Sequence, residues 1–245
     1  MKKLMIAAAA LTAGIVTAEG VVSSDIVGYA QSGLKAGATM TTPQFLNVGS
    51  AEGMPLQSIK PTGDDTSDNV NIQTLDAYGR TQVTYLWVNW AGDEGDQEAW
   101  VDDDEFAIVE DVTFAPGQGL WVTGSSTDQA FQTAGAVGKF DVTVQLRASA
   151  TAVGNPFPVA INLQDILPEG DDTSDNVNIQ ILDAYGRTQV TYLWVNWAGD
   201  EGDLEAWVDD DEFAIVEEVS FMPGQGIWAT GSSTSQYLRF PAPEL

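Results

Sequence analysis

The sequence predicts an all-β protein in which two tandem small antiparallel β-sandwich or barrel domains follow a signal peptide. Two observations lead to this prediction. Short segments that alternate apolar and polar residues are separated by Gly, Pro and Asp turns, and no sustained helical period occurs after the N-terminal segment. Most of the chain also occurs twice, with a period of 107 residues. We predict a first β unit over residues 19–132 and a second over residues 133–245.

The first 18 residues have the parts of a secretory signal peptide in the usual order. Lys2 and Lys3 form a basic start, residues 4–16 are an apolar stretch of 13 residues, and a small-residue cleavage site ends at Ala18. The alternative is an uncleaved membrane anchor, for which this stretch is short, because a spanning helix needs about 20 residues. We therefore predict a secreted protein, extracellular or at the cell surface, whose mature chain does not insert into a membrane.

The duplication is nearly exact over residues 61–126 and 168–233, where 58 of the 66 positions are identical. Upstream the match is weaker but continues between residues 42–45 and 154–157, and between residues 55–59 and 162–166. Each half therefore carries a complete set of the candidate functional residues. This argues against one composite active site and favours two equivalent surfaces, which would raise avidity or build a lattice.

In the first repeat, a strand is expected to begin at Val70 and Ile72. Asp76–Arg80 is a turn in which Gly79 can adopt a positive φ, and the chain returns as a long strand over Thr81–Trp90, which is rich in β-branched and aromatic residues. Together these segments predict a β-hairpin. Apolar residues on both faces of the returning strand indicate a central strand, or one face that is exposed for a partner.

The remaining elements are shorter. Phe106–Val109 is predicted as a short strand, Pro116-Gly117 as a turn, and Gly119–Thr123 as the strand after it. Phe140–Arg147 alternates apolar and polar residues and predicts a half-buried strand. One helical turn is expected near Pro55–Ile59 at most.

Charge and composition exclude several classes of function. The 245 residues include 36 Asp and Glu against nine Lys and Arg, and the net charge of −27 becomes −29 when the two N-terminal lysines are removed. Such a chain repels nucleic acids and anionic membrane surfaces. There is no His and no Cys, which excludes Ser-His-Asp triads, Cys nucleophiles, His or Cys zinc sites and disulfides.

The second repeat carries a recognisable series of motifs, namely Asn155-Pro156-Phe157, Leu163–Ile166, a Trp-bearing hairpin, and Pro223–Trp228. In this layout the chain resembles a group of uncharacterised secreted bacterial proteins that often carry the unit in tandem. The resemblance covers nearly all of the mature chain, twice, and implies a shared β fold and export. It implies no reaction. The first repeat departs from the pattern at Thr42–Phe45, and the dense acidic residues depart from it as well.

Acidic residues form three clusters in each repeat. Oxygen ligands on turns, without His or Cys, suit Ca²⁺ better than a transition metal. Asp64-x-Thr66-x-Asp68 has the oxygen spacing of a calcium loop but lacks the Gly and Glu of an EF-hand. The alternative is an acidic surface that is merely solvated in a salty medium. The candidate metal ligands are Asp64, Thr66, Asp68, Asp93, Asp96, Asp102 and Asp104, with Asp171, Thr173, Asp175, Asp200, Asp203, Asp209 and Asp211.

Tryptophans flank the acidic segment at residues 93–98 and its copy. Exposed Trp beside carboxylates is an arrangement that holds sugars, by stacking on rings and hydrogen bonding to hydroxyls. Trp90, Trp100, Trp197 and Trp207 are therefore candidate ligand-binding residues. The alternative is that they close the end of the hydrophobic core.

These observations favour a non-enzymatic extracellular structural or cell-surface protein, which could associate with itself into filaments or with matrix components through unpaired strand edges. A calcium-dependent carbohydrate-binding tandem module is the main alternative. A glycoside hydrolase with paired carboxylates is disfavoured, because a unit of about 107 residues leaves little room for a deep cleft.

Overall fold

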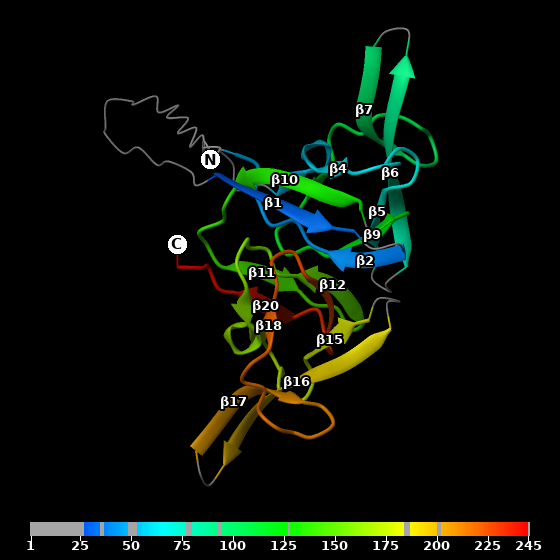
Figure 1. Cartoon of the computed structure of the whole chain (residues 1–245). Helices are drawn as coiled ribbons and strands as arrows, with labels where there is room; N and C mark the ends of the chain where they lie inside the picture. Colours follow the sequence, from blue (N-terminus) through cyan, green and yellow to red (C-terminus); the bar gives the residue numbers. More distant parts are fainter. Residues whose placement is uncertain are drawn as a thin grey trace, which may run out of the picture.

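The computed structural model describes residues 27–34, 37–48, 53–76, 80–92, 95–126, 128–183, 187–199 and 202–244. The predicted signal peptide lies outside these residues. Within them the protein is all-β, with every strand paired antiparallel, which confirms the predicted fold class (Figure 1). None of the described residues forms a helix that is long and apolar enough to cross a membrane.

The strands of the two halves correspond one to one. The first half contains β1 (Val27–Gly33), β2 (Gly37–Thr41), β3 (Met54–Pro55), the 3₁₀ turn η1 (Leu56–Ser58), β4 (Lys60–Thr62), β5 (Asn71–Leu75), β6 (Thr81–Gly92), β7 (Gly95–Asp102), β8 (Thr113–Phe114), β9 (Leu120–Gly124) and β10 (Ala130–Ala136). The second half contains β11 (Val142–Gln145), β12 (Ala150–Gly154), β13 (Ile161–Asn162), η2 (Leu163–Asp165), β14 (Leu167–Gly170), β15 (Asn178–Leu182), β16 (Thr188–Gly199), β17 (Gly202–Asp209), β18 (Ser220–Phe221), β19 (Gly226–Thr230) and β20 (Gln236–Phe240).

Each half forms the same set of sheets. The first half has a five-stranded sheet in the order β2-β9-β5-β6-β7, a three-stranded sheet in the order β1-β10-β4, and the pair β3-β8. The second half repeats this topology as β12-β19-β15-β16-β17, β11-β20-β14 and β13-β18. The duplication of the sequence is therefore a duplication of a complete sheet topology.

The five-stranded and three-stranded sheets of each half pack as a β-sandwich-like pair. In β9, Leu120 and Val122 are buried and the intervening Trp121 is half-buried, as expected when alternate residues of a strand face the core. They join a cluster that includes Phe131 from the three-stranded sheet. A second cluster, drawn from residues 142–240, has no member in common with the first, which is drawn from residues 34–137.

Several predicted elements are confirmed. The hairpin is formed by β5 and β6, with Ile72 opposite Tyr85. The strand after the Pro-Gly turn is β9, and η1 is the single helical turn near Pro55–Ile59. The alternating segment forms β11, which begins at Val142 and leaves Phe140 exposed.

Other details differ from the predictions. The predicted strand over Phe106–Val109 is wrong, because this segment makes only an isolated bridge between Ile108 and Val101. β7 covers part of a segment that the sequence analysis treated as an acidic loop. Gly, Asp and Glu obscure the strand signal there, and a two-stranded hairpin that projects from the sandwich tolerates such residues. The predicted boundary between residues 132 and 133 falls inside β10.

Candidate binding surface

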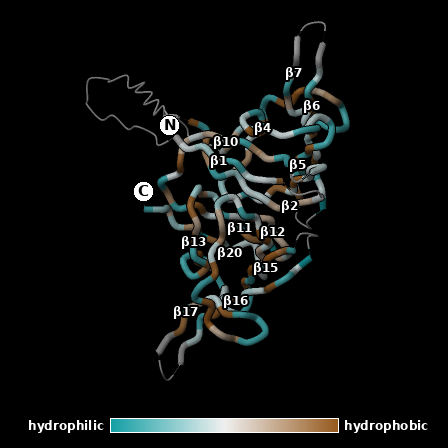
Figure 2. Tube along the Cα trace, in the orientation of Figure 1, coloured by the Kyte–Doolittle hydropathy of each residue, from teal (hydrophilic) through white to brown (hydrophobic). Residues whose placement is uncertain are grey.

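The most prominent feature of each half is the long hairpin that projects from the five-stranded sheet. The hairpins β6–β7 and β16–β17 extend from opposite ends of the molecule (Figure 1). Hydrophobic segments continue from the sandwiches onto the base of both hairpins (Figure 2). The geometry at these bases decides which predicted residues can meet a ligand.

One face of each hairpin base is anchored in the core by a tryptophan pair. Trp87 and Trp100 lie opposite each other with ring centroids 5.4 Å apart, and Trp194 and Trp207 repeat the pair at 5.5 Å. Trp100 and Trp207 are completely buried, and their indole N–H groups each donate a 2.7 Å hydrogen bond to a backbone carbonyl. A buried, hydrogen-bonded indole cannot stack on a sugar, so the prediction of ligand binding is wrong for these two residues.

A glutamine holds each hairpin in place and was missed by the sequence analysis. Gln164 accepts a hydrogen bond from the backbone N–H of Trp207 (3.0 Å) and donates to the carbonyls of Trp207 (2.8 Å) and Val216 (2.7 Å). Gln57 makes the same contacts in the first half. The signal was present in the sequence, since the Leu-Gln pair at 56–57 recurs at 163–164. The Leu163–Ile166 motif is therefore a clamp on β17 and the loop that follows it.

The opposite face of the hairpin base carries exposed aromatic residues. Trp197 and Phe213 are 41% and 54% exposed, and their rings stack at 6.4 Å between centroids with 24° between planes. Trp90 and Phe106 occupy the equivalent positions and are 38% and 55% exposed. We name these residues, with the neighbouring Ile108 and Ile215, the hairpin patches. The predicted exposure is thus found for Trp90 and Trp197.

The loop that presents Phe213 has a strained backbone. Phe213 has φ of 54° and Phe106 has φ of 52°, a region that bulky residues avoid at a cost of about 1–2 kcal/mol. Asp209 fixes this loop, because its Oδ1 accepts hydrogen bonds from the backbone N–H groups of Asp211 and Glu212, at 2.9 and 3.1 Å. Both halves hold an exposed aromatic residue in this unfavourable backbone conformation, which indicates a role other than packing.

Polar groups border the second hairpin patch. The Trp197 indole N–H donates to Asp175 Oδ2 at 3.3 Å. On the other face of the hairpin, which Trp194 and Trp207 share, the Asn196 amide donates to Glu205 Oε1 at 2.6 Å. In the first half the Asn89 amide donates to Glu98 at 3.1 Å. The patch thus combines a flat apolar surface with the Asp175 carboxylate at its edge.

The predicted metal ligands that the structure describes lie in two segments of each half. Asp64, Thr66, Asp68 and their copies Asp171, Thr173 and Asp175 lie in the loops before β5 and β15, and Asp102, Asp104, Asp209 and Asp211 lie at the ends of β7 and β17. Asp93 and Asp200 lie outside the described residues, as do the side chains of Asp96 and Asp203. Across the described residues, no three acidic side chains come together in a group that could hold a metal ion.

The described loops use their polar groups internally. The buried Gln129 amide donates to the carbonyls of Asp64 and Asp65, at 3.1 and 2.9 Å, and Gln236 does the same in the second half. Asp102 Oδ1 accepts hydrogen bonds from the backbone N–H groups of Asp104 and Glu105. These hydrogen bonds stabilise the turns themselves, and no metal ion is needed to explain them. The calcium site stays a prediction that a binding measurement must test.

Two tyrosines at the hairpin bases have raised pKa values. Burial raises the pKa of Tyr85, and the nearby Asp102 carboxylate raises it further. Burial and Asp209 raise the pKa of Tyr192 in the same way. Both hydroxyls therefore stay neutral at physiological pH.

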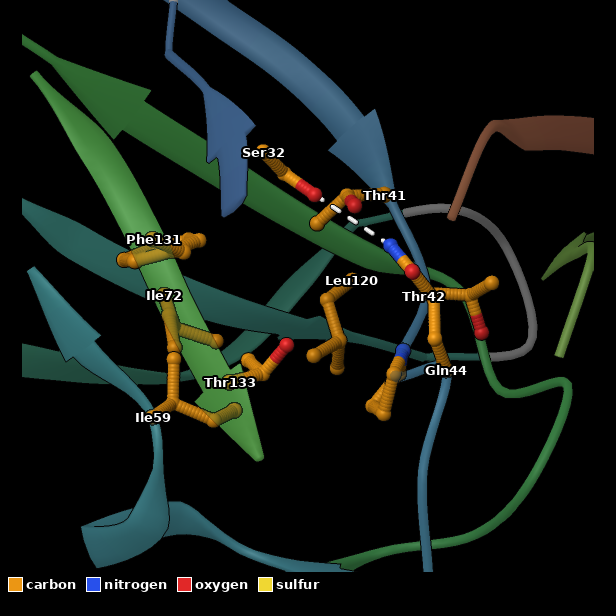
Figure 3. A pocket seen from close by; sticks show the side chains of 10 residues that line it. Ser32, Thr41, Thr42, Gln44, Ile59, Ile72, Leu120, Phe131 and Thr133 are labelled. Atoms are coloured by element: carbon orange, nitrogen blue, oxygen red, sulfur yellow. Dashed lines mark hydrogen bonds between the residues drawn. The ribbon is translucent and has the colours of Figure 1, made fainter. Parts of the chain in front are cut away.

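A small cavity lies in the first half between the two sheets, where Gln44 donates a 3.2 Å hydrogen bond to Ser32 (Figure 3). Its volume is about 20 Å³, and Ile59, Leu120 and Phe131 form part of its wall. Ligand pockets usually measure about 300–1,000 Å³. This cavity is a packing gap, whereas the hairpin patches are open to a large partner.

The chain matches no protein-family model, and no significant match was found among curated proteins or solved structures.

Proposed function

We propose that this chain is an exported, non-enzymatic structural protein of the cell surface or extracellular matrix, which connects partners through its two hairpin patches. The observation that carries the proposal is the position of the two hairpins at opposite ends of one molecule (Figure 1). A molecule with two equivalent sites that face apart can bridge two partners, or extend a chain of partners, whereas one site would only decorate a surface.

The near-identity of the two hairpins supports this proposal. Residues 81–96 are the same as residues 188–203, although Asn89 and Trp90 are exposed, and the two hairpins differ only where Gln97 corresponds to Leu204. Positions outside the hairpins do differ between the halves, both buried ones, where Leu120 corresponds to Ile227, and exposed ones, where Ala115 corresponds to Met222. Exposed positions usually tolerate substitution better than buried ones. Two tips of the same sequence can bind the same partner at both ends.

The chemistry of the chain also favours a connector over an enzyme. Without His or Cys, proton transfer and nucleophilic attack would depend on carboxylates, Tyr, Lys, Ser or Thr. Acid–base catalysis by a carboxylate usually requires one that is desolvated in a cleft. The carboxylates of the Asp102–Glu105 turn are instead half-buried or exposed at the surface.

A bridging assay tests the proposal. Fluorescent protein is mixed with cell-surface fragments from the producing cells, and both bound protein and clumping of the fragments are measured. We expect Trp90→Ala or Trp197→Ala alone to keep part of the binding but lose clumping, and the double variant to lose both. Phe140→Ala, which removes an exposed aromatic outside the hairpins, is the control. Clumping by the double variant at the wild-type level would contradict the proposal.

Carbohydrate is the second candidate for the ligand of the patches. The observation that favours it is the stack of Trp197 on Phe213 with the Asp175 carboxylate beside it, because sugars bind to aromatic faces through their C–H surface and to polar groups through hydroxyls. A glycan array, with and without a calcium chelator, tests this candidate. Binding that is lost in Trp197→Ala and Trp90→Ala supports it, and binding that survives in the double variant contradicts it.

A further inference from the structure

The two halves dock on each other through their Pro-Gly-Gln-Gly turns, Pro116–Gly119 and Pro223–Gly226. The proposed function does not use these turns. The Gly119 N–H donates to the carbonyl of Ala152 at 3.0 Å, and the Gly154 N–H donates to the carbonyl of Gly117 at 3.1 Å. The turn of the first half thus pairs with the end of β12 in the second half, and Gln118 lies opposite Val153.

The reverse contact has the same form. The carbonyl of Gly224, in the turn of the second half, accepts hydrogen bonds from the Thr42 N–H at 3.1 Å and from the Thr41 hydroxyl at 2.8 Å. Gln225 lies opposite Thr41 at the end of β2. Each half therefore offers one turn and one strand end, and each receives the same two features from the other. This is the pattern of an isologous interface, in which a surface pairs with another copy of itself.

The glycines of the turns are required by this close approach. A Cβ atom on Gly119 would lie 2.6 Å from the carbonyl carbon of Ala152, and one on Gly226 would lie 2.7 Å from the carbonyl carbon of Met40. Gly117 and Gly224 have φ of 77° and 69°, which favours glycine. The motif shared by both repeats is thus explained by docking, whereas the sequence analysis interpreted it only as a turn.

Opening the contact between the halves would keep each hydrophobic cluster within one half, and would uncover Val142 and Val144 at the edge of the second cluster, where Gly117 lies against them. The two hydrophobic clusters share no described residue, and the main-chain contacts named above join the halves. A largely polar groove of about 420 Å³ also runs along the junction, between Pro116 and Gln118 of one half and Gln145 and Arg147 of the other. Interfaces of this polar kind within a chain resemble transient protein–protein contacts.

The halves are joined by the short segment 137–141, between the end of β10 and the start of β11. We propose that the docking surface also binds a second copy of this chain, by exchange of halves between molecules. A first half can pair with the second half of a neighbour through the bonds that it makes within its own chain. A linear assembly formed in this way has an unpaired half at each end. Exchange can therefore build dimers and longer assemblies at high concentration.

The absence of cysteine from the chain gives a direct test. In a Thr41→Cys, Gln225→Cys double variant of the full-length protein, a disulfide can form across the docking surface, since paired residues on antiparallel strands have Cα atoms about 4.5–5.5 Å apart. The control is Tyr29→Cys, Ala134→Cys, an exposed pair in register on β1 and β10 of one half. Melting of the reduced variants confirms that both fold.

Both variants are incubated at micromolar and at millimolar concentration, oxidised, and separated on a non-reducing gel. We expect the Thr41/Gln225 pair to give locked monomers at the low concentration and a ladder of covalent oligomers at the high one, while the control stays monomeric at both. Adding Trp90→Ala and Trp197→Ala should leave the ladder unchanged, which separates exchange from association through the hairpin patches.

Three outcomes would overturn the proposal. Monomers alone from the Thr41/Gln225 pair at both concentrations would show that the halves do not exchange. A ladder of equal strength from the control would place the exchange in β1 or in unfolded chains. A pair that does not oxidise at all would contradict the contact between Thr41 and Gln225 itself.

Discussion

The strained aromatic residues carry the clearest local signal in the molecule. Phe213 lies in a backbone region where Gly is comfortable and where a Cβ atom clashes with the following carbonyl. The cost persists in both halves, and the side chain is more than half exposed, so packing does not account for its position. Presentation of the ring beside Trp197 accounts for it, because the turn places the two rings in a stack.

This strain predicts an unusual order of stability at position 213. We expect Phe213→Gly to be more stable than Phe213→Ala by about 1 kcal/mol, because both variants lose the ring and only Gly relieves the positive φ. Urea unfolding measures the difference. At Phe140, which is also exposed but has no positive φ, Ala should be at least as stable as Gly. The same order at both positions would contradict a strained turn.

The two classes of tryptophan should also separate in stability. Trp207→Phe loses the hydrogen bond to the Ile166 carbonyl and leaves a gap in a filled core, which we expect to cost about 2–4 kcal/mol. Trp197→Phe changes a partly exposed ring and should cost less than about 1 kcal/mol. Equal losses by urea unfolding would mean that Trp197 is a core residue in solution.

At the scale of the elements, strands with a clear period could be predicted from the sequence, and the second strand of the projecting hairpin could not. The β5–β6 hairpin has apolar β-branched residues around a Gly turn, and burial enforces that pattern. Glu98 and its neighbours in β7 extend beyond the sandwich, where burial imposes no period. The strand prediction for Phe106–Val109 failed for the opposite reason. Its apolar residues suggested a strand, but they lie in a loop in which Phe106 and Ile108 are exposed.

The candidate site was predicted in part. In the sequence Trp90 and Trp197 lie close to acidic residues, and in the structure both side chains are exposed. Trp100 could not be separated from them, because residues on opposite faces of a hairpin look alike until the register is known. The docking function of the Pro-Gly-Gln-Gly turns depends on a contact between distant halves, which local sequence patterns do not encode.

Asp141 fastens the segment between the halves to the last strand and should give a pH-dependent contribution to stability. Its carboxylate accepts a hydrogen bond from the Ala242 N–H at 2.8 Å and pairs with Arg239 at 2.9 Å. The Ala242 N–H lowers the pKa of Asp141, and Arg239 lowers it further. A lowered pKa in the folded state means that the contribution is present above the unfolded pKa of about 3.9 and is lost as the pH falls through the folded value.

Melting of the wild type and of Asp141→Asn between pH 2.5 and 7 tests this contact. We expect the wild type to melt at the higher temperature near pH 7, and the difference to close below about pH 4. Asp128→Asn, at another exposed aspartate, is the control and should give no such closing difference. A difference that does not depend on pH would show that Asp141 acts through shape and not through charge.

At the scale of the whole molecule, the large negative net charge determines the salt conditions in which this protein is stable. Thirty-six acidic residues face nine basic ones, and the ion pairs found among the described residues involve Arg80, Arg187 and Arg239. Exposed pairs of this kind contribute at most about 1 kcal/mol each. Repulsion between carboxylates therefore opposes folding, and it opposes contact between two acidic molecules as well. An extracellular medium rich in salt relieves both effects.

This balance predicts that cations stabilise the fold. We expect the melting temperature to rise continuously as NaCl increases from about 10 mM to 1 M, because the screening length falls from about 30 Å to 3 Å over that range. Calcium distinguishes screening from sites. A steep rise at micromolar to millimolar CaCl₂, beyond that given by MgCl₂ at equal ionic strength, would support calcium ligands among the acidic loops. If CaCl₂ and MgCl₂ act alike, the carboxylates serve as a solvated coat and the calcium prediction fails. A melting temperature that does not respond to NaCl would instead contradict carboxylate repulsion as the force that opposes folding.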